Sequence, residues 1–218
     1  MRTLNIINIG LMDYEEALQF QYKLVNDRKK NIICDTLVLI EHPHVYTIGL
    51  IGNRKNILLS NEKLKRKNIK IVNSERGGDV TYHGPGQIVG YCIVDFKKFS
   101  YTINKYVYYL EEVFIILLKQ LFSIDSFREK KYPGVWTNQG KVLAIGIRIK
   151  DGIMYHGFAF NVNTDLRYFE NIIPCGIPGK GVTSLSCITN SYHNIDNIKN
   201  LIIRYFSEIF KYNFFNYE

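Results

Sequence analysis

Helical and extended apolar spacings alternate along the chain, and this alternation most constrains the fold. Helical spacing covers residues 13–25, where Asp13 and Glu16 are placed as in a capping box. It returns over residues 103–121 as the longest helical pattern and over residues 198–210 as the last one. The sequence therefore predicts three amphipathic helices spread over the chain.

Short runs rich in β-branched and aromatic residues lie between these helices. They predict strands at residues 36–41, 45–49, 69–72, 88–95, 134–136, 141–149 and 155–163. The order is helix, strands, helix, strands, helix, which differs from the regular alternation of a βαβ array. We therefore expect an α+β fold with a mixed, largely antiparallel sheet flanked by helices.

The length and composition suit one folded unit. A chain of 218 residues, 46% of them apolar, can fill a single core, and no repeat or low-complexity linker divides it. The longest apolar run, residues 113–118, is too short to cross a bilayer, and the N-terminal residues lack the apolar core of a signal peptide. We expect a single domain over residues 1–218, soluble, cytoplasmic and not bound to a membrane.

Charge and cysteine usage narrow the possible partners. Lys and Arg outnumber Asp and Glu by 28 to 20, and the resulting net charge of +8 favours an acidic partner. The basic groups are separated by apolar strands, which disfavours a nucleic-acid-binding face. Four cysteines occur without CxxC pairs, as is typical of a reducing compartment.

The segment 76–87, R-G-G-D-V-T-Y-H-G-P-G-Q, is unusually rich in glycine. Neither G-x-G-x-x-G nor G-x-x-x-x-G-K-[ST] fits it, so a nucleotide-binding loop is disfavoured. Gly77 and Gly78 permit close approach of the backbone to a ligand, and Pro85 fixes a turn. A site wall and a simple strand-to-strand connection both remain open.

The histidines do not form a metal motif. His42 and His44 flank Pro43, while His83 and His156 lie beside glycines, and none is accompanied by a carboxylate or thiolate at ligand spacing. Isolated histidines of this kind are more often structural. We expect no metal.

The cysteines differ in their surroundings. Cys34 precedes a predicted strand and Cys92 lies within one, so both are expected in the core. Cys175 lies in P-C-G within a turn-rich segment, where a thiol is accessible and a cation or backbone N–H groups can lower its pKa. An ordinary loop cysteine has the same appearance, so a nucleophile and a structural residue both remain open.

Four blocks together resemble one family. They are residues 76–87, G-K-V-L-A-I-G-I-R-I at 140–149, H-G-F-A-F-N-V-N-T-D-L at 156–166 and P-C-G at 174–176. E-H-P-H-V-Y-T-I-G at 41–49 is also similar. The set resembles the octanoyl-(acyl-carrier-protein):protein N-octanoyltransferases, the lipoyl/octanoyl transferases of lipoate biosynthesis, over nearly the whole chain.

The resemblance implies the fold of biotin-protein ligases and lipoate ligases and an acyl transfer in two steps. The thiolate of Cys175 would take the octanoyl group from octanoyl-acyl carrier protein, and a lysine of a lipoyl domain would then accept it as an amide. Thioester exchange is nearly balanced in energy whereas the amide is far more stable, so the second step would drive the first. No ATP and no cofactor are implied.

The resemblance also assigns a role to Lys141, which matches the family lysine that lowers the pKa of the nucleophile. A depression by one unit corresponds to about 1.4 kcal/mol in favour of the thiolate. The same amine could act as general acid and base. Without the resemblance, Lys141 is an ordinary turn lysine.

The substrate-contacting blocks of the family also map onto this sequence. The matching residues are Arg76, Gly77, Gly78, Asp79, Val80, Thr81, Tyr82, His83, Ala144, Ile145, Gly146, Gly157, Phe158 and Ala159. Backbone N–H groups near Cys175 or Gly146 are candidate oxyanion donors. Ile145, Phe158 and Val80 are expected walls of an apolar slot, in which each acyl methylene contributes ~0.8 kcal/mol.

The implied partners are octanoyl-acyl carrier protein, which is acidic and suits the net charge, and the lipoyl domains of 2-oxoacid dehydrogenase E2 subunits and of the glycine cleavage H protein. An ATP-dependent lipoate or biotin ligase shares the implied fold but needs no cysteine nucleophile. Cys175 and Lys141 in their sequence contexts therefore favour the transferase.

Overall fold

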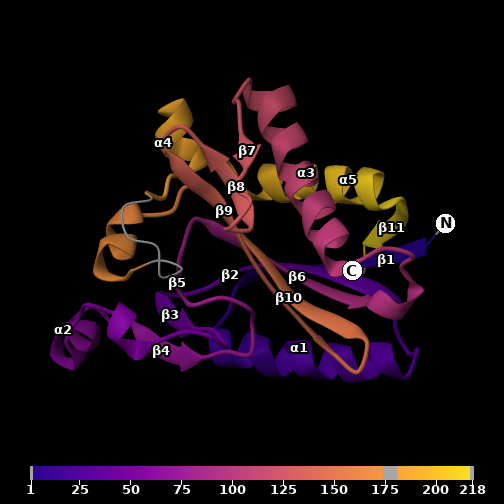
Figure 1. Ribbon diagram of the computed structural model, residues 1–218, viewed down its shortest axis with the longest axis horizontal. Helices are drawn as coiled ribbons and strands as arrows, with labels where there is room; N and C mark the ends of the chain where they lie inside the picture. Colours follow the sequence, from indigo (N-terminus) through magenta and orange to yellow (C-terminus); the bar gives the residue numbers. More distant parts are fainter. Residues whose placement is uncertain (1, 174–180, 217–218) are drawn as a thin grey trace.

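An eight-stranded mixed sheet forms the centre of the molecule (Figure 1). Its strands in spatial order are β11 (Tyr212–Asn216), β1 (Arg2–Leu11), β2 (Asp35–Glu41), β6 (Gln87–Asp95), β10 (Ile153–Asn161), β9 (Gly140–Lys150), β8 (Gly134–Thr137) and β7 (Phe127–Arg128). β1 pairs in parallel with β11 and β2, and all other neighbours are antiparallel. The computed structural model describes residues 2–173 and 181–216. The predicted α+β class with a largely antiparallel sheet is confirmed.

A second, three-stranded sheet lies at one end of the large sheet (Figure 1). Its order is β4 (Lys70–Asn73), β3 (Val45–Ile48) and β5 (Val80–His83). A short 3-10 helix, η1 (Arg54–Asn56), and α2 (Asn61–Arg66) connect β3 to β4. Reading the glycine-rich segment as a plain connection is therefore wrong in part, because β5 forms its centre and is buried throughout.

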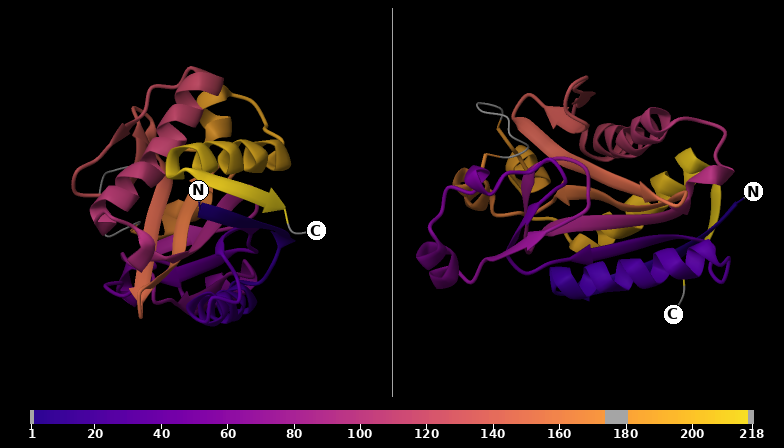
Figure 2. Two further views of the ribbon diagram at one scale, coloured as in Figure 1. Left: turned by 90° about the vertical axis from the view of Figure 1, so that its right-hand side faces the viewer. Right: turned by 60° about the horizontal axis from the view of Figure 1, so that its bottom comes forward.

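Three longer helices cover the two faces of the large sheet (Figure 2). They are α1 (Tyr14–Lys29) on one face, and α3 (Ile103–Phe122) and α5 (Ile195–Phe210) on the other. All three were expected from the apolar spacing, and Asp13 caps α1 by accepting a hydrogen bond from Glu15 N at 2.9 Å. Shorter elements complete the described chain, namely η2 (Phe96–Lys98), η3 (Leu166–Asn171) and α4 (Leu185–Thr189).

Each face of the sheet has its own core. Leu110, Phe114 and Leu117 of α3 are fully buried against α5 and the sheet, and each such side chain contributes about 1.5–3 kcal/mol. Cys92 lies in this core, as predicted. Cys34, which precedes β2, is only partly buried, so the prediction of a core position is wrong for this residue. No helix within the described ranges has the length and apolar character needed to cross a bilayer.

Candidate active site

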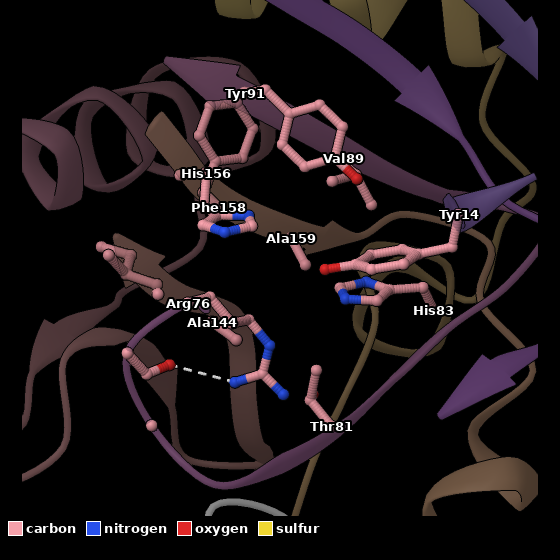
Figure 3. A pocket seen from close by; sticks show the side chains of 15 residues that line it. Tyr14, Arg76, Thr81, His83, Val89, Tyr91, Ala144, His156, Phe158 and Ala159 are labelled. Carbon is pink, nitrogen blue, oxygen red and sulfur yellow. Dashed lines mark hydrogen bonds between the residues drawn. The ribbon is translucent and has the colours of Figure 1, made fainter. Parts of the chain in front are cut away.

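A cavity opens between strands β9 and β10 of the large sheet and the loop that leads into β5 (Figure 3). Its lining includes eleven of the fourteen sequence-predicted binding residues: Arg76, Gly77, Gly78, Thr81, His83, Ala144, Ile145, Gly146, Gly157, Phe158 and Ala159. Tyr14, Val89, Tyr91 and His156 complete it. Asp79, Val80 and Tyr82 do not line the cavity, so the fold brings most of the candidate set together but not all of it.

Arg76 holds the loop that forms one side of the cavity. Its guanidinium donates to Thr47 O at 2.8 Å, to Thr47 Oγ1 at 2.9 and 3.0 Å, to Gly77 O at 3.0 Å and to Asp79 O at 2.6 Å. The side chain is buried, so these acceptors replace the water that a guanidinium would otherwise bind. Arg76 thus fixes the backbone of the loop as well as lining the cavity.

Asp79 fastens the same loop from its other side. Its carboxylate accepts from Val80 N at 2.7 Å, from Asn53 N at 3.0 Å and from the Asn56 side chain. The carboxylate therefore ties the loop to η1 rather than facing the cavity. Val80 and Tyr82 point into the core of the small sheet, and Val80 is accordingly not a wall of the slot.

Glycines allow this loop to lie directly against the sheet. Gly77 N donates to Ile147 O at 3.2 Å, and a Cβ on Gly146 would lie 2.9 Å from Gly77 O. A Cβ on Gly157 would lie 2.3 Å from Gly90 O on the neighbouring strand. The glycines in the predicted blocks therefore serve close approach of backbone to backbone, which brings the cavity walls together.

His83 is held in one tautomer at the edge of the cavity. The Gln87 side-chain amide donates to Tyr82 O at 3.1 Å and to Asn161 Oδ1 at 2.9 Å, so its oxygen is the acceptor for His83 Nδ1–H at 2.7 Å. The Nε2 atom therefore keeps a lone pair, and the ring lies under Tyr14 with its nitrogens toward the cavity (Figure 3). Burial, with the charge of Arg76 adding to it, lowers the pKa of His83 well below its ordinary value, so the ring is neutral.

His156 is the most strained residue of the cavity wall. It lies within β10 with a φ of 57°, and its N–H donates to Gln21 Oε1 at 3.1 Å instead of to β6. Both ring nitrogens are buried without a hydrogen-bond partner among the described residues. Burial lowers the pKa of His156 to about 3, and the charges of Arg76 and Arg148 act in the same direction.

Lys141 lines a smaller cavity, which shares Thr81, Ala144 and Ala159 with the first. Its side chain is buried, with Nζ 3.2 Å from Pro133 O and 4.7 Å from the centre of the Trp136 ring. A β-bulge causes this placement, because Val135 pairs with Leu143 but Trp136 pairs with Lys141.

The described residues on either side of segment 174–180 are anchored near Lys141 and η1. Ile173 N donates to a backbone carbonyl of η1 at 2.8 Å, and Lys141 N donates to Gly181 O at 3.0 Å. Cys175, the sequence-predicted nucleophile, lies outside the described residues. Within the described ranges, no three His, Cys, Asp or Glu side chains form a metal-binding group.

Four residues that line the cavity were not predicted from the sequence as substrate contacts. Val89 and Tyr91 alternate along β6 and pair with Ala159 and Gly157, so strand alternation and a known pairing would have found them. His156 had been considered for metal binding alone. Tyr14 begins α1, and nothing in its local sequence marks it.

Comparisons with known proteins identify the family of this chain. The model of the lipoyl protein ligase A/B catalytic domain matches residues 13–207. An octanoyltransferase of Caldicellulosiruptor bescii is 47% identical over 208 residues, covering 95% of this chain and 91% of that protein. An octanoyltransferase of Christiangramia forsetii is 39% identical over 227 residues, covering 96% and 97%.

Solved structures agree on the fold. A putative lipoate protein ligase from T. acidophilum superimposes with a TM-score of 0.75 at 16% identity, covering 100% of this chain and 88% of that one. A biotin protein ligase from Aquifex aeolicus gives 0.56 at 14% identity, covering 95% and 68%. The expected likeness to both ligase folds is confirmed. By its sequence, this chain belongs to the lipoyl protein ligase A/B catalytic-domain family and, within it, to the octanoyltransferases, and it is an acyltransferase.

Proposed function

We propose that this protein transfers an octanoyl group from octanoyl-acyl carrier protein to a lysine of lipoyl domains, through a thioester on Cys175 and without ATP. The acceptors are the lipoyl domains of 2-oxoacid dehydrogenase E2 subunits and the glycine cleavage H protein. The free Cys34, Cys92 and Cys187 suit a reducing cytoplasm.

The observation that supports this proposal is the buried ammonium of Lys141 in a small cavity that shares Thr81, Ala144 and Ala159 with the largely apolar one. In the sequence Cys175 lies between Ile173, whose N–H donates to η1, and Gly181, whose carbonyl accepts from Lys141 N. A cation in a buried site lowers the pKa of a nearby thiol, and it needs no metal or cofactor to do so. Lys141 and Cys175 are therefore assigned as activating cation and nucleophile.

The two steps balance as simple acyl exchange. The Cys175 thiolate attacks the thioester carbonyl of the donor, a carbon–sulfur bond to the enzyme forms, and the bond to the carrier breaks. The departing carrier thiolate takes a proton from Lys141. The neutral amine of the acceptor lysine then attacks the enzyme thioester, gives a proton to Lys141 and expels the Cys175 thiolate as the amide forms.

The cavity suits the acyl chain. Ala144, Ile145, Phe158 and Ala159 present apolar surface, and each buried methylene of the chain contributes ~0.8 kcal/mol. The titratable rings around it, those of His83 and His156, are held neutral by burial. The neutral rings and apolar side chains favour a hydrocarbon tail, and the Lys141 ammonium in the adjoining cavity favours the reacting thioester.

An ATP-dependent ligase is the alternative with the same fold. Some structural neighbours are described with ATP, including a lipoate-protein ligase A and the A. aeolicus biotin protein ligase. They share about 15% sequence identity with this chain and support the fold alone, whereas the octanoyltransferases share up to 47%. The higher identity favours the transferase.

Intact-mass spectrometry after mixing with octanoyl-acyl carrier protein tests the proposal. The protein should gain one octanoyl group without ATP, Cys175→Ala should gain none, and Cys187→Ala, which removes an exposed thiol outside the site, should react normally. Adding an apo-lipoyl domain should discharge the adduct onto that domain. An octanoyl adduct on Cys175→Ala, or a strict requirement for ATP, would overturn the proposal.

A further inference from the structure

Glu111 of α3 is a buried carboxylate that the proposed reaction does not use. Its side chain is 5% exposed, and it lies on the helix face that packs against β8. In an ordinary amphipathic helix a glutamate faces water, because burying a carboxylate without partners is costly. The partners of Glu111 therefore indicate what it does.

Glu111 and Lys141 bind opposite ends of the same peptide group. Gly134 N donates to Glu111 Oε1 at 2.9 Å, and Lys141 Nζ donates to Pro133 O at 3.2 Å. The carbonyl of Pro133 and the N–H of Gly134 belong to one peptide bond and point in opposite directions. A carboxylate on the N–H polarises the peptide and makes its carbonyl a stronger acceptor for the ammonium.

The backbone at Gly134 is specialised for this arrangement. Its φ is 134°, and a Cβ there would lie 2.2 Å from Leu143 O and 3.4 Å from Lys141 Cε. Any side chain at this position would displace the peptide or the Lys141 chain. Glycine thus allows the peptide to lie between the carboxylate and the ammonium.

Charged groups from three elements surround this peptide. α3 supplies Glu111 and Glu112, β7 supplies Arg128 and β9 supplies Lys141, while Tyr132 precedes the peptide in the chain. Arg128 Nε lies 3.2 Å from Glu111 Oε2, and the Arg128 guanidinium also pairs with Glu112. Burial raises the pKa of Glu111, while the Gly134 N–H, Arg128 and Lys141 oppose that rise.

We propose that Glu111 is a positioning residue that acts through the Pro133–Gly134 peptide to hold Lys141 in place and in its charged form. Desolvation favours a neutral lysine, so a buried ammonium needs compensation of this kind. The inference rests on the proposed function, in which charged Lys141 lowers the pKa of Cys175.

The direction in which Glu111→Gln shifts the pKa of Cys175 distinguishes this role from a simple charge effect. Glu111→Gln removes a negative charge but retains an oxygen that can accept from Gly134 N. If Glu111 acts only as a nearby negative charge, its loss stabilises the Cys175 thiolate and lowers the pKa of the thiol. If Glu111 supports Lys141, its loss weakens the cation and raises that pKa.

The experiment is the pH dependence of iodoacetamide alkylation, quantified on the peptide that carries Cys175. Glu111→Gln should raise the midpoint by about half to one pH unit, a roughly three- to tenfold loss of thiolate at neutral pH. It should lower kcat for octanoyl transfer with KM for the carrier unchanged. Glu112→Gln, the neighbouring carboxylate that also pairs with Arg128, is the matched control and should leave the midpoint unchanged.

The same measurement in a Lys141→Met background distinguishes failure of this inference from failure of the proposed function. Lys141→Met should raise the midpoint by itself, and Glu111→Gln added to it should raise it no further. An unchanged midpoint in Lys141→Met would refute the activating role of Lys141. A midpoint raised by Lys141→Met but unchanged or lowered by Glu111→Gln would refute the inference alone. If Glu111→Gln does not fold, Glu111→Asp, which keeps the charge but has a side chain too short to reach Gly134 N, should also raise the midpoint.

Discussion

The buried histidines and the buried Lys141 have opposite surroundings. The rings of His42 and His83, which contact Tyr14, and of His156, which contacts Tyr91, are neutral, and the His156 ring lacks hydrogen-bond partners within the described chain. Lys141, by contrast, has around its ammonium the aromatic face of Trp136 and the carbonyl of a peptide whose N–H is bound by Glu111. A buried group keeps its charge only where the fold supplies compensation, as it does around Arg76 and around Lys141.

Lys141→Met should produce the largest effect, because it removes the ammonium that is proposed to activate Cys175. Octanoyl transfer should fall by about 10²- to 10⁴-fold, the range for a general acid–base group. The fold should survive, since methionine can occupy most of the space of the lysine stem. Transfer rates measure the loss of activity, and thermal melts measure any loss of stability. His156→Asn, which changes one of the neutral buried rings, should lose far less activity. Equal losses of activity in both variants would contradict the contrast between Lys141 and the histidines.

Arg76→Met should cost stability more than chemistry. The guanidinium donates to Thr47 O, Gly77 O and Asp79 O, of which Asp79 O also accepts from Gly49 N at 3.2 Å. A buried acceptor left unpaired costs about 1–3 kcal/mol. We expect a loss of roughly 3–5 kcal/mol in urea unfolding after partial relaxation of the loop.

Arg54→Met is the matched control for this loss. Arg54 is exposed and donates to Ile57 O and Asn61 Oδ1 at the surface, so its removal should cost less than about 1 kcal/mol. A loss as small for Arg76→Met as for Arg54→Met would show that the loop does not depend on the guanidinium.

Sequence periodicity captured the elements whose signal is local. α1, α3 and α5 and seven strands follow from helical or extended spacing. β1 and β11 were missed because their pairing joins Arg2 to Tyr212 across the whole chain and polar Asn5 and Asn8 interrupt the apolar pattern of β1. β5 was missed because the flanking glycines and Pro85 resemble a turn, whereas pairing with β3 makes the segment a strand.

Some residues of the candidate site could likewise be predicted from local sequence, and others could not. The residues grouped by sequence blocks, such as Gly77, Gly146 and Gly157, come together because three backbones meet there. Glu111 has the sequence appearance of an ordinary helix-surface glutamate, and its burial follows only from the packing of α3 against β8. A residue that acts through a peptide of another element leaves no signal in its own segment.

The neutral histidines should make stability fall in mild acid. Burial lowers the pKa of His42 to about 4 and that of His156 to about 3, below the ordinary 6.5. The unfolded chain therefore binds protons first, so the contribution is complete above about pH 6.5 and decreases as the pH falls toward these values. Each histidine should lower the free energy of unfolding by about 1.4 kcal/mol per pH unit in that window, or by about 2 kcal/mol at pH 5.

Urea unfolding between about pH 5 and 6.5 measures this slope, above the range in which most carboxylates titrate. His156→Asn removes one of the three buried histidines, and asparagine tolerates the left-handed backbone at this position. The slope should therefore drop by about 1.4 kcal/mol per pH unit. The same slope in the variant as in the wild type would mean that His156 ionises freely in the folded protein.

Gly146→Ala should give the smallest effect, because it alters the spacing of the cavity walls without changing any charge. The added methyl would lie 2.9 Å from Gly77 O, so the loop must move by a few tenths of an ångström. We expect a loss of about 1 kcal/mol, or roughly 2–4 °C in Tm, and a rise in KM for the octanoyl donor of a few fold. Gly10→Ala, whose methyl would meet nothing within 4 Å, is the control and should change neither quantity. An unchanged KM in Gly146→Ala would mean that the acyl chain does not lie between this strand and the loop.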